Sequence, residues 1–278
     1  MDIDKANIHN LTHLWKKYNV QDFEINNLLM LHANTRWPHR YWFNWNELSC
    51  SKVLHALRVD IGINTLIEKI PDSAIVAVWN LDDSTNEDKQ CLYLLEKILE
   101  QNQFFCSFEQ TAMFLELDKL PDSVSLASEL GGELGGELGG ELGGTKKFQI
   151  KSVRTTKEIS SWVDIASNAF AYTIDHSVIE SLINDEDIKI LLLSQAGSAV
   201  ASALLFKTGN VIGVHQVGVM QKFQGKGIAK WLMQYIINTC IQWQGKTIVL
   251  QASDAGKPLY DSLGFKGQFL IKNYQREF

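Results

Sequence analysis

The sequence predicts an α/β protein built from two blocks, each of which combines helices with strands. Short β-branched and apolar runs, typical of buried strands, alternate with longer segments whose apolar residues recur with a helical period. Three strand-like runs follow one another at 188–195, 199–208 and 211–220, and tight turns of sequence AGS and TGN separate them. Such turns typically join antiparallel neighbours, so these runs predict the core of a sheet.

Composition and charge narrow the class of protein. The chain has 278 residues, enough for one large domain or two modest ones, and 45% of them are hydrophobic and 21% charged, as in ordinary soluble proteins. A net charge of −6 argues against a broad basic face for nucleic acid. The sequence has no signal-peptide pattern and no apolar run of about 20 residues that could cross a bilayer. We therefore expect a cytoplasmic protein with neither a nucleic-acid nor a membrane partner.

The cysteines carry no metal-binding pattern. Four are present, at Cys50, Cys91, Cys106 and Cys240, and no CxxC pair occurs among them. Their apolar surroundings predict buried, reduced thiols and no metal site.

A repeat divides the chain. Residues 129–144 read ELGG four times, and a segment that is half glycine favours a flexible linker over a packed element. We interpret residues 1–125 as an N-terminal α/β domain, 126–146 as the linker and 147–278 as a second domain. An inserted surface loop within one domain is the alternative.

The elements of the first block follow from periodicity. Helical spacing predicts helices over 11–18, 23–32 and 89–103, whereas alternating or continuous apolar runs predict strands over 40–45, 73–80 and 111–118. The block is therefore mixed, with helices and strands in alternation.

The second block is more regular. Strands are predicted over 148–153, 188–195, 199–208, 211–220, 246–253 and 267–274, and helices over 156–170, 177–183, 226–241 and 256–265. The predicted order is β-α-α-β-β-β-α-β-α-β.

The stretch VMQKFQGKGIAKWLMQYI, at 219–236, joins a strand to an amphipathic helix through two glycines and a lysine. The first turn of a helix leaves backbone N–H groups without partners, and the helix dipole makes this end attractive to an anion. Gly225 and Gly227 would let a phosphate approach the backbone closely, and Lys226 adds positive charge. The sequence fits neither the GxxxxGK[ST] phosphate loop nor the GxGxxG dinucleotide fingerprint.

These residues resemble the acetyl-CoA signature of the Gcn5-related N-acetyltransferase (GNAT) superfamily, [Gln/Arg]-x-x-Gly-x-[Gly/Ala], in the segment QGKGIA at 224–229. A second motif of the same family, Leu-Tyr-x-x-Leu-Gly-Phe, matches LYDSLGF at 259–265. The resemblance covers most of 148–278. It implies the GNAT fold: a mixed, mostly antiparallel sheet flanked by helices, with a splayed central pair of strands.

The resemblance also implies a mechanism. In the family, the strand before the loop carries a bulge, the pantetheine arm lies in the splay, and a backbone N–H polarises the thioester carbonyl. The residues placed in contact with the co-substrate are Val217, Gly218, Val219, Gln224, Gly225, Lys226, Gly227, Ile228 and Ala229. Tyr260 matches the tyrosine that protonates the departing CoA thiolate in many relatives.

The general base departs from the family pattern. Where relatives often have a carboxylate, this chain has His215 and Gln216, so His215 is the first candidate base and Asp254 the second. Ser253 and Asp254 also replace an asparagine that many relatives have near this point. Lys257 is a candidate contact for a CoA phosphate, with a solvated lysine as the alternative.

The implied function is N-acetyl transfer from acetyl-CoA to an amine on a small molecule or peptide, without a metal. A CoA-binding regulatory module without turnover and a transferase for a longer acyl-CoA are the alternatives. The helix–turn–strand plans of 94–117 and 258–274 are alike, so the first block is interpreted as a degenerate copy of the same fold that lacks the glycine loop. It would wall the acceptor cleft or mediate homodimer contact. The net acidity mildly favours a cationic acceptor through electrostatic steering.

Overall fold

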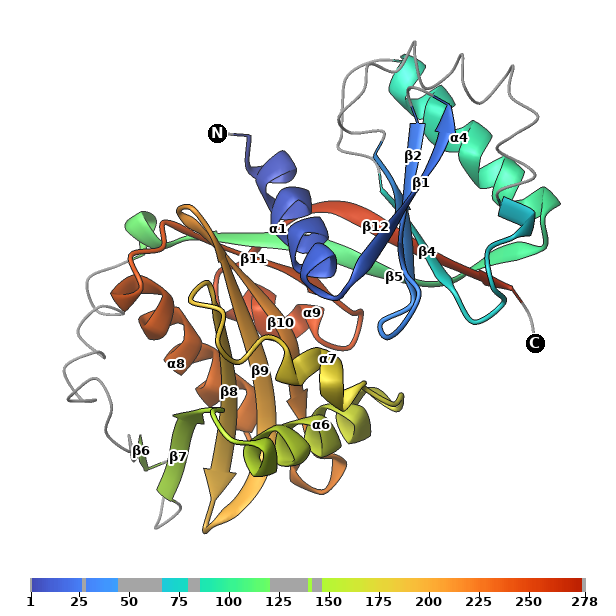
Figure 1. Ribbon diagram of the computed structural model, residues 1–278. Coiled ribbons are helices and arrows are strands. Elements are labelled where there is room, and N and C mark those ends of the chain that lie inside the picture. The colour runs from blue at the N-terminus through green and yellow to red at the C-terminus, as the bar shows by residue number, and fades with distance from the viewer. Residues whose placement is uncertain are drawn as a thin grey trace.

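The computed structural model describes residues 2–26, 29–44, 67–79, 86–120, 140–141 and 147–276. These residues form one continuous twelve-stranded sheet, in the order β1-β2-β3-β4-β12-β5-β11-β10-β9-β8-β7-β6. Figure 1 shows this sheet running through both halves of the chain. Its strands are β1 (Val20–Asn26), β2 (Leu29–Asn34), β3 (Arg40–Phe43), β4 (Ile75–Trp79), β5 (Phe104–Glu116), β6 (Gly140–Glu141), β7 (Lys147–Ser152), β8 (Ile188–Gln195), β9 (Ser198–Thr208), β10 (Val211–Val219), β11 (Thr247–Ala252) and β12 (Lys266–Arg276).

Helices cover both faces of the sheet. The helices are α1 (Ile3–Lys17), α4 (Asn86–Gln101), α6 (Thr156–Phe170), α7 (His176–Glu180), α8 (Ile228–Gln242) and α9 (Lys257–Ser262). The buried residues of α1, α6 and α7 share one hydrophobic cluster, whereas α8 and α9 pack in another with the opposite side chains of β9 and β10. In Figure 1, α1 crosses the face that also carries α6 and α7. The site described below lies between these two layers.

The strand order is symmetric about the β5–β12 pair. On one side, β1, β2 and β3 are antiparallel neighbours and β3 runs parallel to β4; on the other, β8, β9 and β10 are antiparallel and β10 runs parallel to β11. The pairs β4–β12 and β11–β5 are both antiparallel. Each half thus places its last strand inside the other half, which supports the interpretation of the first block as a related copy.

This strand exchange bears on the domain division. β5 comes from the first block but lies between β11 and β12 of the second. The boundaries at 1–125, 126–146 and 147–278 stay a prediction, and the first block contributes to the central sheet itself. Gly140 and Glu141 of the repeat form β6, paired with Phe148 and Lys147 of β7. The rest of 126–146 lies outside the described residues.

The predicted order of the second block is confirmed, and the first block brings two corrections. The helix predicted over 23–32 is wrong: these residues contribute to the β1–β2 hairpin, in which Phe23 pairs with Leu31. β2 lies inside the sheet and Leu31 is buried there, so its apolar residues are too dense to show a clear period of two. β5 begins at Phe104, well before the predicted start at Thr111.

The cysteine prediction is confirmed only in part. Cys240 is a buried free thiol on α8, as expected, whereas the free thiol of Cys106 is exposed on β5. Cys106 belongs to the first residues of β5, which the sequence prediction had left outside the strand. Cys50 lies outside the described residues. Among the described helices, none has the length and apolar character needed to cross a membrane.

Candidate active site

The two parallel strands β10 and β11 separate along their length. They pair only at Val211–Gly213 with Thr247–Val249, although β10 continues to Val219 and β11 to Ala252. Beyond Gly213, β10 pairs only with β9, and β11 pairs only with β5. The result is a V-shaped gap in the ladder with free backbone groups along both edges, which is the splay that the sequence implied.

A β-bulge lies on the β10 side of this V. His215 pairs with Leu204 and Gly218 with Ser202, so β10 has one residue more than β9 between these pairs. Gln216 takes up the extra length with a φ of 52°, and its carbonyl accepts a hydrogen bond from Ser202 Oγ at 3.2 Å. The bulge leaves the backbone of Gln216 and Val217 without a ladder partner, so it can bind a molecule lying in the V.

Gly218 is required by close packing. A Cβ at this position would come within 2.8 Å of Ala169 Cβ near the end of α6. Because only glycine fits, the bulge is held tightly against α6, and the free edge of β10 is fixed in position.

The glycine loop ends at an open helix N-terminus. Gly225 and Gly227 have φ values of 72° and 78°, and no other group lies within 4 Å of where a Cβ would be at either position. Gly227 is the N-cap of α8 and provides no side-chain hydrogen bond to its first turn, which contains Ile228 and Ala229. The N–H groups of this turn therefore stay available, and open space lies over the loop. The donor set and the space both fit a diphosphate.

The side chains of the glycine loop supply positive charge and tie the loop to β10. Lys222 and Lys226 each lie 5.2 Å from the ring centroid of Phe223, and Lys226 Nζ donates to the carbonyl of Lys222 at 2.8 Å. Gln224 Nε2 donates to the carbonyl of Val219 at 3.0 Å, so this side chain ties the loop to the end of β10. Two ammonium groups therefore lie beside the helix N-terminus.

Tyr260 lies on α9, the helix that follows β11. Its ring packs edge-on against Phe265, with centroids 5.7 Å apart, and lies close over Gly256. Burial raises the pKa of Tyr260 to about 12, so the phenol stays protonated at neutral pH. Among the described residues its hydroxyl has no hydrogen-bond partner, which leaves it free to donate.

His215 is placed differently from a general base. It is buried beneath α1, and its Nε2 lies 3.2 Å from Oδ1 of Asn10. Burial lowers the pKa of His215 to about 3, with an opposing contribution from Gln251. A histidine with so low a pKa holds a proton weakly at neutral pH, so this geometry favours a structural role. The catalytic role of His215 stays a prediction.

The other candidates lie near the turn after β11. Ser253 and Asp254 are exposed there. Lys257 Nζ lies 2.8 Å from the carboxylate of Asp261, so this lysine already has an anionic partner. Because Asp254 is exposed and His215 is buried, Asp254 is the more accessible of the two candidate bases.

The burial of His215 predicts a pH-dependent stability. The pKa is lower in the folded state than in the unfolded state, so the unfolded chain binds more protons between about pH 6.5 and 3. Stability should therefore decrease as the pH is lowered from about 6.5 to 3, and His215→Gln should remove this contribution. Chemical denaturation of both proteins at several pH values measures the difference. If His215 were instead the base, the variant would lose activity with little change in this pH dependence.

Several residues near the V were not found from the sequence. Asn7 and Asn10 of α1 are buried: Asn7 Oδ1 accepts from Gln251 Nε2 of β11 at 2.7 Å, and Asn10 Nδ2 donates to the carbonyl of Phe206 at 2.9 Å. Through these bonds α1 covers the closed end of the V. Tyr172, after α6, donates to Gln216 Oε1 of the bulge at 3.1 Å. No local pattern marks these residues, because their partners are far away in the sequence.

A cavity lies apart from this site. It has a volume of about 920 Å³ and is lined by residues of α1, including His9 and Lys16, and by Lys207 and Val211 near the closed end of the V. None of the residues from 214 to 260 lines it. Within the described residues, no group of three or more His, Cys, Asp or Glu side chains could hold a metal ion.

Comparison with known proteins agrees with this geometry. Residues 154–272 match the model of the acetyltransferase (GNAT) domain family. A GCN5-related N-acetyltransferase from Kribbella flavida has a similar structure, with a TM-score of 0.62 and 14% identity over 99% of this chain and 95% of that one. A second, from Sphaerobacter thermophilus, has a TM-score of 0.58 and 14% identity over 92% and 82% of the two chains. No curated protein was found to resemble the chain in sequence.

The glycine loop belongs to one of the two motifs that carried the resemblance to the GNAT class, and the splayed strands and the bulge are features that this resemblance implied. Residues 154–272 match the GNAT acetyltransferase domain family, and the fold around them is consistent with that match. The Kribbella and Sphaerobacter structures extend the similarity of fold to the first block, since both alignments cover nearly the whole chain.

Proposed function

We propose that this protein transfers an acetyl group from acetyl-CoA to an amine by direct attack within a ternary complex. The observation that carries the proposal is the position of the V: β10 leaves β11 at a bulge and then leads, through the glycine loop, into the uncapped N-terminus of α8. A diphosphate on the first turn of α8 would let an extended arm follow the free edge of β10.

In the proposed reaction, the amine nitrogen attacks the thioester carbonyl carbon, and the carbonyl π electrons move to oxygen. A backbone N–H near Val217 would stabilise this oxyanion, because the bulge leaves such groups unpaired. The oxyanion re-forms the carbonyl as the C–S bond breaks, and the nitrogen loses a proton to a base or to water. The thiolate takes a proton from Tyr260, and the resulting phenolate regains a proton from solvent. The products are the N-acetylated amine and CoA.

Two alternatives keep the same binding site. A CoA-binding regulatory module would bind acetyl-CoA without turnover, and the position of His215 keeps this option open because it leaves the base unassigned. A transferase for a longer acyl-CoA would show greater activity with larger acyl groups. A small-molecule or peptide acceptor, a homodimer and a cytoplasmic location all stay predictions.

The proposal is tested by calorimetric titration with acetyl-CoA, followed by a thiol-release screen over amino acids, peptides, polyamines and aminoglycosides. We expect saturable binding and amine-dependent release of free CoA. Binding without release for any amine would favour the regulatory module, and no binding would overturn the proposal. Replacing acetyl-CoA with longer acyl-CoAs in the same screen identifies the preferred acyl group.

A further inference from the structure

Among the residues that the structure describes, one cation at the junction of the two halves has no anionic partner. Arg40 begins β3, and its guanidinium lies near the rings of Trp15 and Phe108, with Cζ 5.8 and 5.6 Å from their centroids. Its Nη1 donates to Oδ1 of Asn273 on β12 at 2.6 Å. Within the described part of the chain, no carboxylate lies within ion-pair distance of this side chain.

Among the described residues, no neighbouring anion compensates the positive charge of Arg40. Burial lowers the pKa of Arg40 to about 10, so the group still carries its charge at neutral pH. A guanidinium has five N–H donors, and Asn273 accepts from it without supplying a charge. Withdrawing a cation from water is unfavourable unless an anion compensates it. By contrast, Arg36 pairs with Asp175 at 2.6 Å, and Arg276 with Asp72 at 3.2 Å.

Tyr172 connects Arg40 to the bulge. The tyrosine hydroxyl donates to Gln216 Oε1 at 3.1 Å, where the backbone of β10 is free to bind a thioester. Partial burial of the Tyr172 hydroxyl raises its pKa, while Gln216 and the charge of Arg40 act in the opposite direction. The charge of Arg40 therefore acts on the Tyr172 hydroxyl, and Tyr172 in turn contacts the bulge through Gln216.

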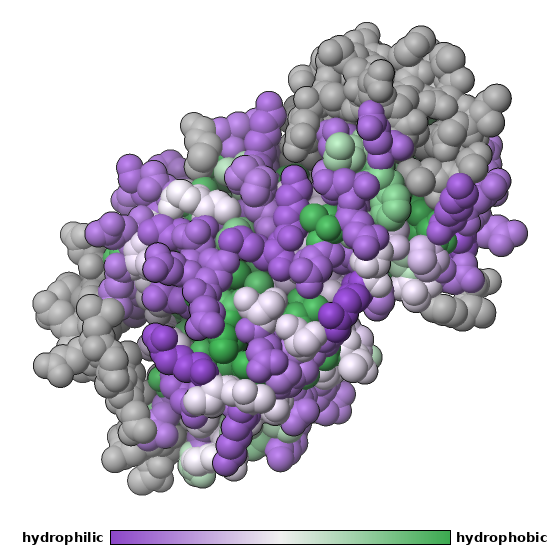
Figure 2. Space-filling view, in the orientation of Figure 1, coloured by the Kyte–Doolittle hydropathy of each residue, from purple (hydrophilic) through white to green (hydrophobic). Residues whose placement is uncertain are grey.

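Exposed aromatic rings surround this position. Phe108, Phe170 and Tyr172 are 38%, 38% and 43% exposed, which is unusual for side chains of this size. The rings of Phe170 and Tyr172 stack with centroids 5.7 Å apart. Figure 2 shows apolar surface, framed by polar side chains, near the centre of the face that carries α1, α6 and α7. These rings offer a contact surface to an apolar ligand beside the cation.

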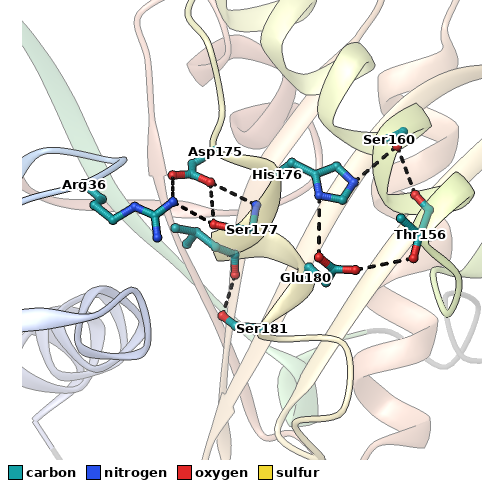
Figure 3. Close-up of polar contacts among 9 residues, drawn as sticks. Arg36, Thr156, Ser160, Asp175, His176, Ser177, Glu180 and Ser181 are labelled. Carbon is teal, nitrogen blue, oxygen red and sulfur yellow. Dashed lines mark hydrogen bonds and ion pairs between the residues drawn. The ribbon is translucent and has the colours of Figure 1, made fainter.

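The loop before β3 is anchored on the GNAT domain. Arg36 Nη2 donates to Asp175 Oδ2 at 2.6 Å and to Ser177 Oγ at 2.8 Å at the start of α7 (Figure 3). In the same region His176 lies 3.2 Å from Ser160 Oγ of α6. These bonds fix the start of β3, and with it Arg40, relative to α6 and the bulge.

We infer that Arg40 binds the carboxylate of the acceptor, so that the preferred acceptors are amines that also carry a carboxylate and an apolar group, such as aromatic amino acids. This inference rests on the proposed acetyl transfer and names the chemical class of its acceptor. A guanidinium recognises a carboxylate through paired, charge-assisted hydrogen bonds. The net charge of −6 favours cationic amines at long range, but at the site itself Arg40 would repel the second ammonium group of a diamine.

The test compares acceptors that differ only in charge. Comparing phenylalanine with phenethylamine, and tryptophan with tryptamine, isolates the contribution of the carboxylate. A series of straight-chain ω-amino acids against monoamines and diamines of equal length shows the distance at which the carboxylate is recognised. The measurements are kcat/KM from thiol release and, separately, calorimetric binding of each amine to the CoA-saturated protein.

Arg40→Gln should lower kcat/KM for the acids by about thirtyfold or more, because it removes one partner of a charge pair, and should leave the decarboxylated amines unchanged. Arg40→Lys should restore part of this preference. Lys17→Gln is the matched control: it removes a cation that is already paired with Asp185 at 2.6 Å, and the preference should persist.

The two hypotheses fail in different ways. If no amine releases CoA but acids still bind in an Arg40-dependent manner, acetyl transfer is wrong and the carboxylate site stands. If amines are acetylated but acids are neither preferred nor bound more tightly than their decarboxylated partners, the inference about Arg40 is overturned. Equal loss for acids and amines in Arg40→Gln would overturn it as well, since this points to a structural role.

Discussion

Replacing Gly227 with valine is expected to lower the affinity for coenzyme A by about tenfold or more, which corresponds to about 1.4 kcal/mol of binding free energy. A valine side chain would project into the open space above the loop, where the diphosphate is proposed to lie. It would also disfavour the φ of 78° that turns the chain into α8. Both effects act on the N–H groups of the first turn, and isothermal titration calorimetry measures the loss directly.

Gly197 provides a matched control for this substitution. It lies in the turn between β8 and β9, has a φ of 77°, and likewise has no group within 4 Å of where a Cβ would be. Gly197→Val therefore carries a similar backbone penalty, about 1–2 kcal/mol of unfolding free energy, at a position away from the V. We expect both variants to be destabilised alike and only Gly227→Val to lose affinity. Equal affinity in the two variants would contradict a diphosphate site at α8.

The local signals of the second block made its fold predictable. β8 consists of a continuous apolar run ending in a tight turn, and the helix predicted over 156–170 has the same bounds in the structure. The glycine loop could be located because its function depends on backbone conformation and on the adjacent helix, both of which follow from nearby residues. The V and the bulge were expected only because the resemblance to the GNAT family implied them.

The first block and the acceptor side could not be predicted in the same way. The exchange of β5 and β12 depends on pairing between segments far apart in the chain, such as Asn273 with Phe108. Arg40 looked like an ordinary polar residue at the edge of an aromatic run, and only the fold places it near Trp15 and Phe108. The surroundings of His215 could not be predicted for a related reason, since its burial under α1 and its contact with Asn10 are tertiary features.

The strand exchange also explains how a residue of the first half can take part in the proposed site of the second half. In the symmetric order, the parallel pair β3–β4 occupies the place that β10–β11 occupies in the second half. Arg40 belongs to this counterpart pair and pairs with Ile75, while its side chain reaches β12. The first half, which lacks the glycine loop, thereby contributes a side chain near the bulge of the second half. This assigns it a role in acceptor recognition within the proposed function.

Tyr260→Phe is expected to lower kcat by about two orders of magnitude while leaving the affinity for acetyl-CoA almost unchanged. The substitution removes only the hydroxyl that is proposed to give its proton to the departing thiolate. Because burial raises the pKa of Tyr260 to about 12, the wild-type phenol is a neutral donor throughout the usual assay range. Its ring packing against Phe265 should survive in phenylalanine, so the free energy of unfolding should stay within about 0.5 kcal/mol.

The matched control for this prediction is Tyr235→Phe, which removes a tyrosine hydroxyl from α8, where the Tyr235 ring stacks on Trp231. Its kcat should equal that of the wild-type protein. The decisive comparison is single-turnover thiol release against calorimetric affinity for acetyl-CoA in the same preparations. A fall in kcat with intact affinity assigns proton donation to Tyr260. Parallel losses of affinity and stability would show that the hydroxyl supports packing, and an unchanged kcat would show that another donor, such as water, protonates the thiolate.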